Sequence, residues 1–575
     1  MERWRLFGLR MPLDHSQGDV ERAICAKLHL PEEVLLSHRL VKESIDARRK
    51  GEISLVIAVD LELELNDRQK NQLLRRFANS QQLRPTPDET YAFVVEPERS
   101  QEVQPLAERP LVIGAGPCGY FAALLLAEMG FRPLLLERGQ PVKQRTKDTF
   151  GFWRGTKGFD PESNAQFGEG GAGTFSDGKL YSQISEPARY VRKVLEELVA
   201  AGANPDILTL HHPHIGTFRL ATVVRGLRGK IQSLGGEVRF GTKVEELLLA
   251  EDGSRRVEGV RLATGECLRA NHVVMAVGHS ARDTFHRLEQ QGVAMERKPF
   301  AVGLRIEHPQ SLIDQARWGE MAGHPRLGPA EYKLVHHTAS GRDVYSFCMC
   351  PGGLVVGATS EEGCVVTNGM SQHSRQERNA NSGLVVNITC EDMEPWARWP
   401  GDALAGVAFQ RHWEQRAFRV GGGNYAAPGQ RLVDFFANQT SEETSQGCGQ
   451  VEGSYLPGIK LGSLNGCLPD FVLQAIREAL PAFATKLPGY LLDEALLTGV
   501  ETRTSSPIRI PRDNMSLQSA NIPGLYPAGE GAGYAGGILS AAIDGIKVAE
   551  ALALSLRSPL PHSRGEPAGS ACGPA

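Results

Sequence analysis

The sequence predicts an α/β protein with a Rossmann-type dinucleotide-binding domain, an α+β substrate domain inserted into it, and a ferredoxin-like N-terminal domain. Three observations lead to this prediction. A glycine fingerprint lies between two short apolar strands that begin near Pro110. A second glycine-rich block lies close to the C-terminus, and the first 97 residues alternate between strand-like and helix-like patterns.

The composition indicates a large globular protein. Hydrophobic residues make up 41% of the chain and charged residues 23%, which permits a large buried core and argues against global disorder. The net charge of −4 argues against a protein that coats nucleic acid. No stretch reaches the about 18 apolar residues of a membrane span, and no signal-peptide core is seen. The ten cysteines are scattered apart from Cys348 and Cys350, so we expect reduced thiols and a cytoplasmic location.

Residues 1–97 read as a separate α+β domain with the order β-α-β-β-α-β, which is the ferredoxin-like arrangement. Its predicted elements are an apolar strand at Trp4–Leu9, a helix at Asp19–Leu28, strands at Leu35–Ile45 and Ile53–Leu65, a helix at Asp67–Asn79 and a strand at Tyr91–Val95. The other predicted segments are a linker (98–109), the dinucleotide-binding domain (110–297 and 500–555), the inserted substrate domain (298–499) and a disordered tail (556–575).

The first glycine block has the full context of a dinucleotide fingerprint: strand, glycine turn, helix, strand and acidic residue. Gly114 permits the turn, Gly116 lets the backbone approach a pyrophosphate, and Gly119 lets helix and strand pack closely. Glu137, 18 residues beyond Gly119 (137 − 119), is expected to bind the adenosine ribose. The predicted contacts in this block also include Pro117 and Arg138.

The second block distinguishes FAD from NAD. Here a strand delivers Gly529 and Glu530, and a helix begins at Ile538 after the Gly536-Gly537 turn. FAD proteins of the glutathione-reductase type have a similar block at the ribitol and the pyrimidine edge of the flavin. There a helix N-terminus stabilises the negative charge that appears on reduction. A domain that binds NAD alone has no need of this element, so the predicted cofactor is FAD.

Two further segments complete the predicted cofactor site. The cluster Phe167–Gly178 contains Gly170, Gly171 and Thr174, whose backbone N–H groups can face a pyrophosphate or the isoalloxazine ring. The apolar run that starts at His272 ends at Gly278, at the position where a buried strand meets the cofactor.

These blocks together resemble a widespread family of uncharacterised FAD-dependent dehydrogenases. The resemblance covers most of the chain up to about Ala553 and rests on six motifs: Phe167–Leu180, Ser346–Gly353, Thr367–Ser371, Asn379–Asn381, Glu501–Arg509 and Gly529–Gly537. It implies bound FAD in a glutathione-reductase-type fold with a ferredoxin-like N-terminal domain, and it supplies no substrate. Glu530 departs from the broader superfamily, in which many flavoproteins place Asp.

No catalytic residue and no metal site is predicted. The C-x-C pair Cys348 and Cys350 could be a redox dithiol, but its spacing fits a structural strand-to-loop role better. Arg305 and Glu307 share one face of a strand and are expected to pair. The other polar candidates each have both a functional and a structural interpretation: His211, His212, His214, His279, Arg503 and Arg509.

The predicted function is hydride transfer between flavin N5 and an unidentified small substrate, with NAD(P)H as a possible transient donor. The alternative is a flavoprotein that acts on or binds RNA through the basic stretches His38–Lys42 and Arg48–Lys50 of its N-terminal domain. Acidic residues interleave with these stretches, which disfavours nucleic acid. A flavin-bearing scaffold without turnover is the third interpretation, and the sequence does not indicate an oligomeric state.

Overall fold

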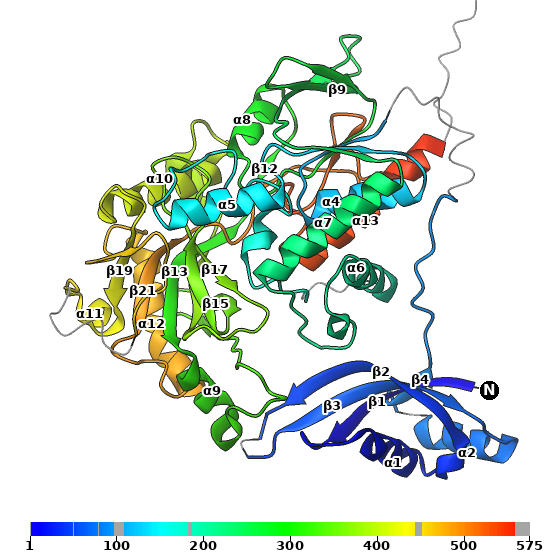
Figure 1. Ribbon diagram of the computed structural model, residues 1–575. Helices are drawn as coiled ribbons and strands as arrows, with labels where there is room; N and C mark the ends of the chain where they lie inside the picture. The colour runs from blue at the N-terminus through cyan, green and yellow to red at the C-terminus, as the bar shows by residue number, and fades with distance from the viewer. Residues whose placement is uncertain are drawn as a thin grey trace, which may run out of the picture.

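The computed structural model describes residues 2–49, 51–78, 80–96, 109–181, 187–442 and 451–557. Within these residues no helix is both long enough and apolar enough to cross a membrane. Figure 1 shows the N-terminal domain at one end of the molecule, below two larger bodies that lie side by side.

The N-terminal domain is a four-stranded sheet in the order β2-β3-β1-β4, with two helices on its outer face (Figure 1). Both helices begin at a capping box, formed by Ser16 with Asp19 and by Asn66 with Gln69. The elements are β1 (Glu2–Met11), α1 (Gln17–Leu28), β2 (Leu35–Asp46), β3 (Ser54–Leu63), α2 (Asp67–Phe77) and β4 (Leu83–Pro85). The predicted element order is therefore present.

The predicted last strand at Tyr91–Val95 is wrong, because the fourth strand is β4 and residues 91–95 carry no strand. This segment instead packs against the dinucleotide-binding domain. Val95 is fully buried in that domain's core, and the Tyr91 hydroxyl donates a hydrogen bond of 2.8 Å to Glu550. Its apolar side chains thus serve a contact between domains, which a strand-like pattern cannot distinguish from sheet pairing.

The dinucleotide-binding domain is built on a parallel sheet in the order β23-β11-β5-β6-β7. Its strands are β5 (Leu111–Ile113), β6 (Leu134–Leu136), β7 (Glu237–Arg239), β11 (Val273–Met275) and β23 (Leu525–Pro527). Its helices are α4 (Pro117–Glu128), α5 (Val142–Trp153), α6 (Ala188–Ala200), α7 (Thr217–Ser233), α8 (Arg282–Gln290) and α13 (Ile538–Arg557). Every residue from Cys118 to Ala127 is buried, which explains the Ala/Leu-rich sequence of α4.

A small antiparallel sheet, β8 (Val244–Leu249), β9 (Val257–Leu262) and β10 (Cys267–Arg269), stands at the upper end of this domain in Figure 1. In the same view α4, α7 and α13 run side by side across the parallel sheet. The last helix, α13, therefore packs on the first, α4, although more than four hundred residues separate them in the sequence.

The inserted domain contains a seven-stranded sheet in the order β14-β15-β18-β13-β21-β19-β20. The strands are β13 (Phe300–Pro309), β14 (Val335–His337), β15 (Asp343–Cys350), β18 (Asn379–Ile388), β19 (Ala427–Arg431), β20 (Ile459–Leu461) and β21 (Leu496–Glu501). A separate hairpin, β16 (Gly353–Gly357) and β17 (Thr367–Ser371), completes it, and the short pair β12 (Glu296–Arg297) and β22 (Ile508–Arg509) lies just outside its two limits. The helices are α9 (Gln310–Trp318), α10 (Ala405–Val420), α11 (Leu432–Ala437) and α12 (Asp470–Lys486).

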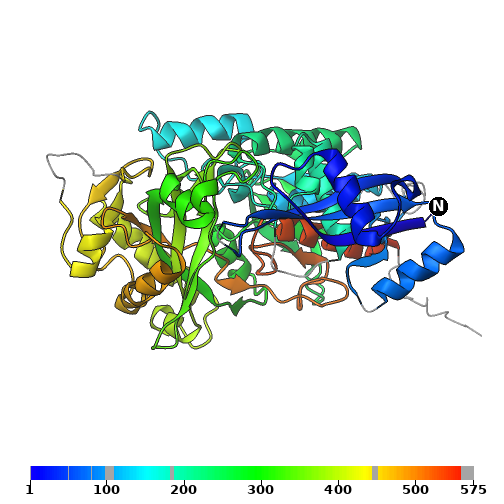
Figure 2. The same cartoon turned by 90° about the horizontal axis from the view of Figure 1, so that it is seen from below.

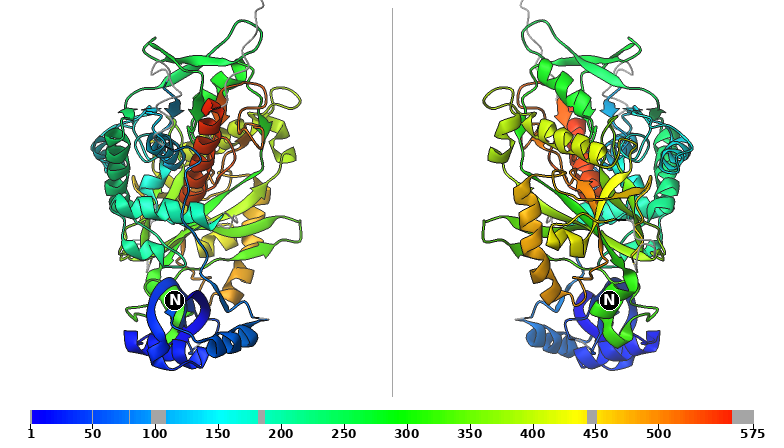
Figure 3. Two further views of the ribbon diagram at one scale, coloured as in Figure 1. Left: turned by 90° about the vertical axis from the view of Figure 1, so that its right-hand side faces the viewer. Right: turned by 90° about the vertical axis from the view of Figure 1, so that its left-hand side faces the viewer.

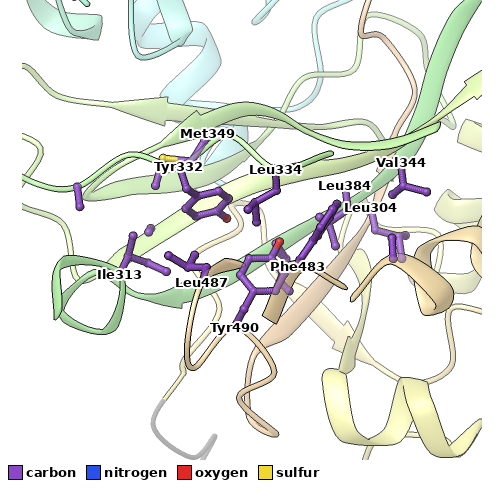
Figure 4. Close-up of a cluster of buried hydrophobic side chains, with 14 of the residues drawn as sticks. Leu304, Ile313, Tyr332, Leu334, Val344, Met349, Leu384, Phe483, Leu487 and Tyr490 are labelled. Carbon is purple, nitrogen blue, oxygen red and sulfur yellow. The ribbon is translucent and has the colours of Figure 1, made fainter. Parts of the chain in front are cut away.

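The two faces of this sheet differ in chemistry. Figure 4 shows one face packed against α12 through Tyr332, Phe483 and Tyr490 in an apolar cluster. The opposite face carries buried polar side chains, including Arg305 and Asn381, both of which have no exposed surface. Buried polar side chains require partners, so this face is the one to search for a site.

The N-terminal domain touches both of the other bodies. The backbone of Glu43 in β2 exchanges hydrogen bonds with Thr209 (2.8 Å) and His211 (2.9 Å) of the dinucleotide-binding domain. His324 of the inserted domain lies 3.2 Å from Asp14. Figures 2 and 3 show the domain, in blue, seated at this end of the molecule.

Candidate cofactor site

The first glycine turn joins β5 to α4 and has the geometry that the fingerprint predicts. Gly114 has φ +102°, and a Cβ there would lie 2.3 Å from the Ala276 carbonyl oxygen. A Cβ on Gly119 would lie 1.8 Å from the Gly114 carbonyl oxygen. A side chain at Gly114 would collide with the segment that follows β11, and one at Gly119 would push α4 away from the turn, so both glycines are required by packing.

The N-terminus of α4 faces a cavity with free backbone donors. Gly116 is the N-cap residue and makes no side-chain cap, and Pro117 follows at the first helical position. The cavity is lined by Ile113, Gly114, Gly116, Leu136, Glu137, Arg138, Gln166, Phe167, Thr242, Lys243, Val244, Met275, Ala276, Val277, Gly278, Ala281 and Thr284. An uncapped helix N-terminus beside a cavity binds anions well, because its N–H groups and its dipole act together.

Glu137 lines this cavity, but its carboxylate already organises the surrounding backbone. It accepts hydrogen bonds from the N–H groups of Ala115 (2.8 Å), Gly139 (2.8 Å) and Gly168 (3.0 Å). A carboxylate offers about four acceptor positions, so one remains for a ribose hydroxyl. The residue therefore ties three turns together as well as presenting an acceptor to the cavity, and the sequence indicated only the second of these functions.

The second glycine loop lies directly against the first. Gly170 and Gly171 have φ +88° and +62°, and a Cβ on Gly171 would lie 3.0 Å from the Cα of Gly116. Thr174 is buried, and its hydroxyl donates to the Glu169 carbonyl oxygen at 3.3 Å. The two predicted pyrophosphate loops are thus brought together.

Arg145 of α5 holds this loop in place, and the sequence did not point to it. Its guanidinium is fully buried and donates to the carbonyl oxygens of Asn164 (2.8 Å), Glu169 (2.8 Å) and Gly171 (2.9 Å). Burial lowers the pKa of Arg145 to about 10. The sequence signal is weak, since an arginine in an amphipathic helix is ordinarily exposed.

We expect Arg145→Met to destabilise the protein by at least about 2 kcal/mol and to weaken FAD retention, because several loop carbonyls lose their donor. Urea unfolding and the flavin content after gel filtration measure these two effects. Arg154→Met is the matched control, since Arg154 lies exposed at the end of the same helix. Equal stability and equal flavin content in the two variants would contradict this function of Arg145.

The C-terminal block meets the same site from the other side. The Gly529 N–H donates to Asp544 at 2.7 Å, and Asp544 is buried and paired with Arg512. Gly536 and Gly537 are exposed at the start of α13, and an added Cβ on either would touch nothing within 4 Å. Ile538 begins the helix. A Cβ added on Gly173 would lie 3.0 Å from the Ile538 side chain, so the two segments are in contact.

His279, just beyond Gly278, provides an independent sign of a ligand. Its Nδ1 lies 3.5 Å from the Glu530 carboxylate, while its Nε2 is buried and has no hydrogen-bond partner among the described residues. A buried imidazole nitrogen without a partner is costly in a protein interior. Together with the uncapped helix and the open glycine turns, this nitrogen fits an elongated ligand with phosphates and hydroxyls, such as a dinucleotide.

One other prediction needs correction. Arg305 does not pair with Glu307: it pairs with Glu501 at 2.8 Å, whereas Glu307 accepts from Ser454 at 2.6 Å. Residues two apart on a strand share a face, but here each finds a closer partner on a neighbouring segment. Of the two interpretations of Arg503, the structural one agrees with the structure, because Arg503 is buried and paired with Glu414 at 2.9 Å.

The histidines form no metal centre within the described residues. Among those residues one set of potential metal ligands lies close together, Glu361, Cys364 and Glu414, and it includes no histidine. Both of its carboxylates are already paired with Arg282, at 2.8 Å for Glu361 and 2.7 Å for Glu414. The arginine satisfies the oxygens that a cation would need.

Comparison with known proteins decides the family. A relative from Clostridium beijerinckii, described as an uncharacterized protein, is 43% identical over 548 residues, which cover 95% of this chain and 98% of the relative. The model of the FAD dependent oxidoreductase family matches residues 182–383, and the model "FAD-dependent protein, C-terminal domain-like" matches residues 299–504. This chain belongs to the FAD-dependent oxidoreductases. The predicted cofactor, FAD, and the predicted enzyme class are thereby confirmed.

Two other comparisons add little about this FAD-dependent oxidoreductase. A domain family of unknown function matches residues 4–62. Among solved structures, P. aeruginosa PqsL in complex with 2-aminobenzoylacetate is 15% identical with a TM-score of 0.31, covering 79% of this chain and 88% of that one. L-proline dehydrogenase from P. horikoshii is 12% identical with a TM-score of 0.31, covering 80% and 96%. Similarities at this level carry no argument about the substrate.

Proposed function

We propose that this oxidoreductase transfers a hydride between FAD and a small molecule bound where the dinucleotide-binding domain meets the inserted domain. When bound, FAD supplies the hydride-transferring atom of its isoalloxazine ring. The observation that carries the proposal is the course of the second glycine loop. It starts at the phosphate-binding turn and ends at the inserted domain, where Asp177 pairs with Arg375 and Lys179 donates to the Met349 carbonyl oxygen.

The residues that would hold FAD fall into three groups. The adenosine half is assigned to Glu137, Arg138 and Gly278, and the pyrophosphate to Gly114, Gly116, Pro117, Gly119, Gly170, Gly171 and Thr174. The ribitol and flavin end is assigned to Gly529, Glu530, Gly536, Gly537 and Ile538, with His279 as an added contact. The cavity is lined by Gly114, Gly116, Glu137, Arg138 and Gly278, and the close approaches of Gly171 to Gly116 and of Gly173 to Ile538 support this order.

The finer fold assignment is part of the same proposal. The sheet order β23-β11-β5-β6-β7 supports a glutathione-reductase-type domain, and the order β2-β3-β1-β4 with α1 and α2 on one face supports a ferredoxin-like domain. The domain limits are kept at residues 97, 110, 298, 500 and 555, although β21 runs across the limit at residue 500.

RNA binding is not proposed, because the basic residues behind it are engaged. Arg39 pairs with Asp60 at 3.1 Å, and Arg48 pairs with Asp46 at 2.7 Å. Both cations therefore have acidic partners within the N-terminal domain, and Lys50 lies outside the described residues.

An anaerobic absorbance titration with NADH and NADPH tests the proposed function. We expect the purified protein to carry FAD, and we expect a nicotinamide at high concentration to bleach the flavin band through transient contact with the flavin. Dithionite serves as the control for full reduction. Bleaching by dithionite alone would remove the nicotinamide donor and direct the search to a substrate-derived hydride. A colourless protein that FAD cannot reconstitute would contradict the proposed function itself.

A further inference from the structure

The turn that follows β15 presents a cysteine in an unusual backbone conformation. Cys348 has φ +42° and lies in a β-bulge between Phe347 and Cys350. Cys348 is exposed, whereas Met349 and Cys350, the two residues that follow it, are buried. A left-handed conformation at a residue other than glycine persists only where its surroundings impose it, and such positions concentrate at functional sites.

Groups from both domains hold this turn. Arg305 Nη1 donates to the Cys348 carbonyl oxygen at 3.2 Å, and Cys350 Sγ donates to the same oxygen at 3.3 Å. Lys179, at the end of the second glycine loop, donates to the next carbonyl oxygen, that of Met349. The backbone of Cys348 is therefore fixed against the loop that begins at the cofactor site, while its thiol remains accessible.

An unsatisfied donor at the base of the turn points to a ligand. Asn381 is fully buried and stands opposite Cys350 across the β15–β18 pair. Its Oδ1 accepts a hydrogen bond of 2.8 Å from Arg305 Nη1, the same nitrogen that donates to the Cys348 carbonyl oxygen. Its Nδ2 has no acceptor among the described residues. A buried donor left without an acceptor costs about 1–3 kcal/mol, so a carbonyl-bearing ligand would relieve a real penalty.

The charged groups around the turn are paired with one another. Arg305 lies 2.8 Å from Glu501, Arg375 lies 2.8 Å from Glu331, and Lys179 lies 3.9 Å from Asp177. Three cations thus face three anions, and an ionised ligand would find its counter-charge already engaged. This balance favours an uncharged ligand.

Cys348 is exposed, and an ordinary cysteine thiol has a pKa of about 8.5. The thiol therefore keeps its proton at neutral pH, so it can give a proton to a substrate but cannot act as a base. A thiol is also a weak hydrogen-bond donor, which suits protonation of carbon better than polarisation of a carbonyl oxygen.

We propose that Cys348 is the proton donor of the substrate site and that the substrate is an uncharged α,β-unsaturated carbonyl compound. This inference rests on the proposed function. In the reductive direction, the β-carbon would take a hydride from the reduced flavin, and a C–H bond would form there as the C=C π bond breaks. The S–H bond of Cys348 breaks and its proton goes to the α-carbon. The thiolate that remains, near Lys179 and Arg305, takes a proton from water. The sum is one saturated carbonyl compound and one oxidised flavin for each unsaturated compound.

The test follows the reoxidation of photoreduced holoprotein in anaerobic stopped flow with two acceptors. The first, 2-cyclohexen-1-one, needs a hydride and a proton, whereas ferricyanide takes electrons without protonation of a substrate. We expect the enone to reoxidise the wild-type flavin with a solvent deuterium isotope effect. We expect Cys348→Ala to slow that reaction by about 100-fold or more, since general acids contribute about 10²–10⁴-fold. Its reoxidation by ferricyanide is expected to match that of the wild type.

Cys267→Ala is the matched control, because Cys267 is an exposed cysteine in β10, on the small antiparallel sheet. It should behave as the wild type with both acceptors. Two results would overturn the proposal: no reoxidation of the wild-type flavin by the enone, or an equal loss with both acceptors in Cys348→Ala, which would mark a structural role. A protein without bound FAD would instead show that the proposed function fails.

Discussion

Replacing Gly116 by valine is expected to reduce FAD affinity by about 10- to 100-fold while leaving the fold intact. The backbone of Gly116 has φ −79°, which any residue adopts, and the nearest atom to an added Cβ is the Cα of Gly171 at 3.9 Å. The added Cβ therefore makes only an ordinary van der Waals contact, but the side chain fills the space in front of the helix N-terminus. Loss of one or two charge-assisted hydrogen bonds to a phosphate costs about 1.5–3 kcal/mol. Fluorescence titration of the apoprotein with FAD measures the change.

The matched control for this variant is Gly158→Val. Gly158 is exposed, and a Cβ there would have no neighbour within 4 Å. The apoproteins of both variants should unfold at the same urea concentration as the wild-type apoprotein. If Gly116→Val binds FAD as tightly as Gly158→Val does, the phosphates do not lie at this turn.

Replacing Glu414 by glutamine is expected to destabilise the protein by about 3–5 kcal/mol, or roughly 6–20 °C in Tm. Glu414 in α10 has no exposed surface and pairs with Arg282 of the dinucleotide-binding domain at 2.7 Å and with Arg503 at 2.9 Å. Its loss leaves two buried guanidinium groups short of a counter-charge. Thermal unfolding followed by circular dichroism measures the effect.

The same network predicts how stability depends on pH. Burial raises the pKa of Glu361, but the hydrogen bond from Arg411 and the charge of Arg282 outweigh it and lower the pKa to about 2. The pKa of Glu414 is likewise lowered by Arg282 and Arg503 despite its burial. A carboxylate with a lowered folded-state pKa stabilises the protein above its unfolded value of about 4.3, and this contribution is lost as the pH falls.

The stability difference between wild type and Glu414→Gln should therefore shrink between about pH 4 and pH 2. Glu258→Gln is the control, because Glu258 is partly exposed and its pairs with Arg256 and Arg269 are 3.5 Å and 3.3 Å long. We expect it to cost less than about 1 kcal/mol. A Glu414→Gln variant as stable as this control would show that the buried network contributes no net stability.

The local features of the cofactor site could be predicted because they depend on neighbours in the sequence. The glycines at positions 114, 116 and 119 follow one strand and open one helix, so spacing alone defines the turn. The same holds for the helix that begins at Ile538. In the N-terminal domain, the periodicity of the apolar residues located α1, α2 and the first three strands.

The partners of buried polar groups could not be predicted, because they come from distant segments. Arg305 finds Glu501, which lies 196 positions away (501 − 305), in preference to the nearby Glu307. Arg145 binds carbonyl oxygens, which every residue possesses and which therefore leave no trace in the sequence. The segment at Tyr91–Val95 has the alternation of a strand, yet its apolar side chains are buried by another domain.

The parallel sheet is completed only by β23, which lies at Leu525–Pro527, and the helix over α4 is the last one described. During synthesis the chain emerges from its N-terminus, and domains generally fold as units. The inserted domain is therefore complete in sequence before the fold that surrounds it can close. We therefore expect the cofactor to bind only when synthesis is almost complete. A nascent chain stopped before residue 525 has the fingerprint but lacks the strand and helix that close the site. The insertion of a whole domain between the strands of the parallel sheet costs little additional free energy, since the loop-closure entropy grows only with the logarithm of loop length.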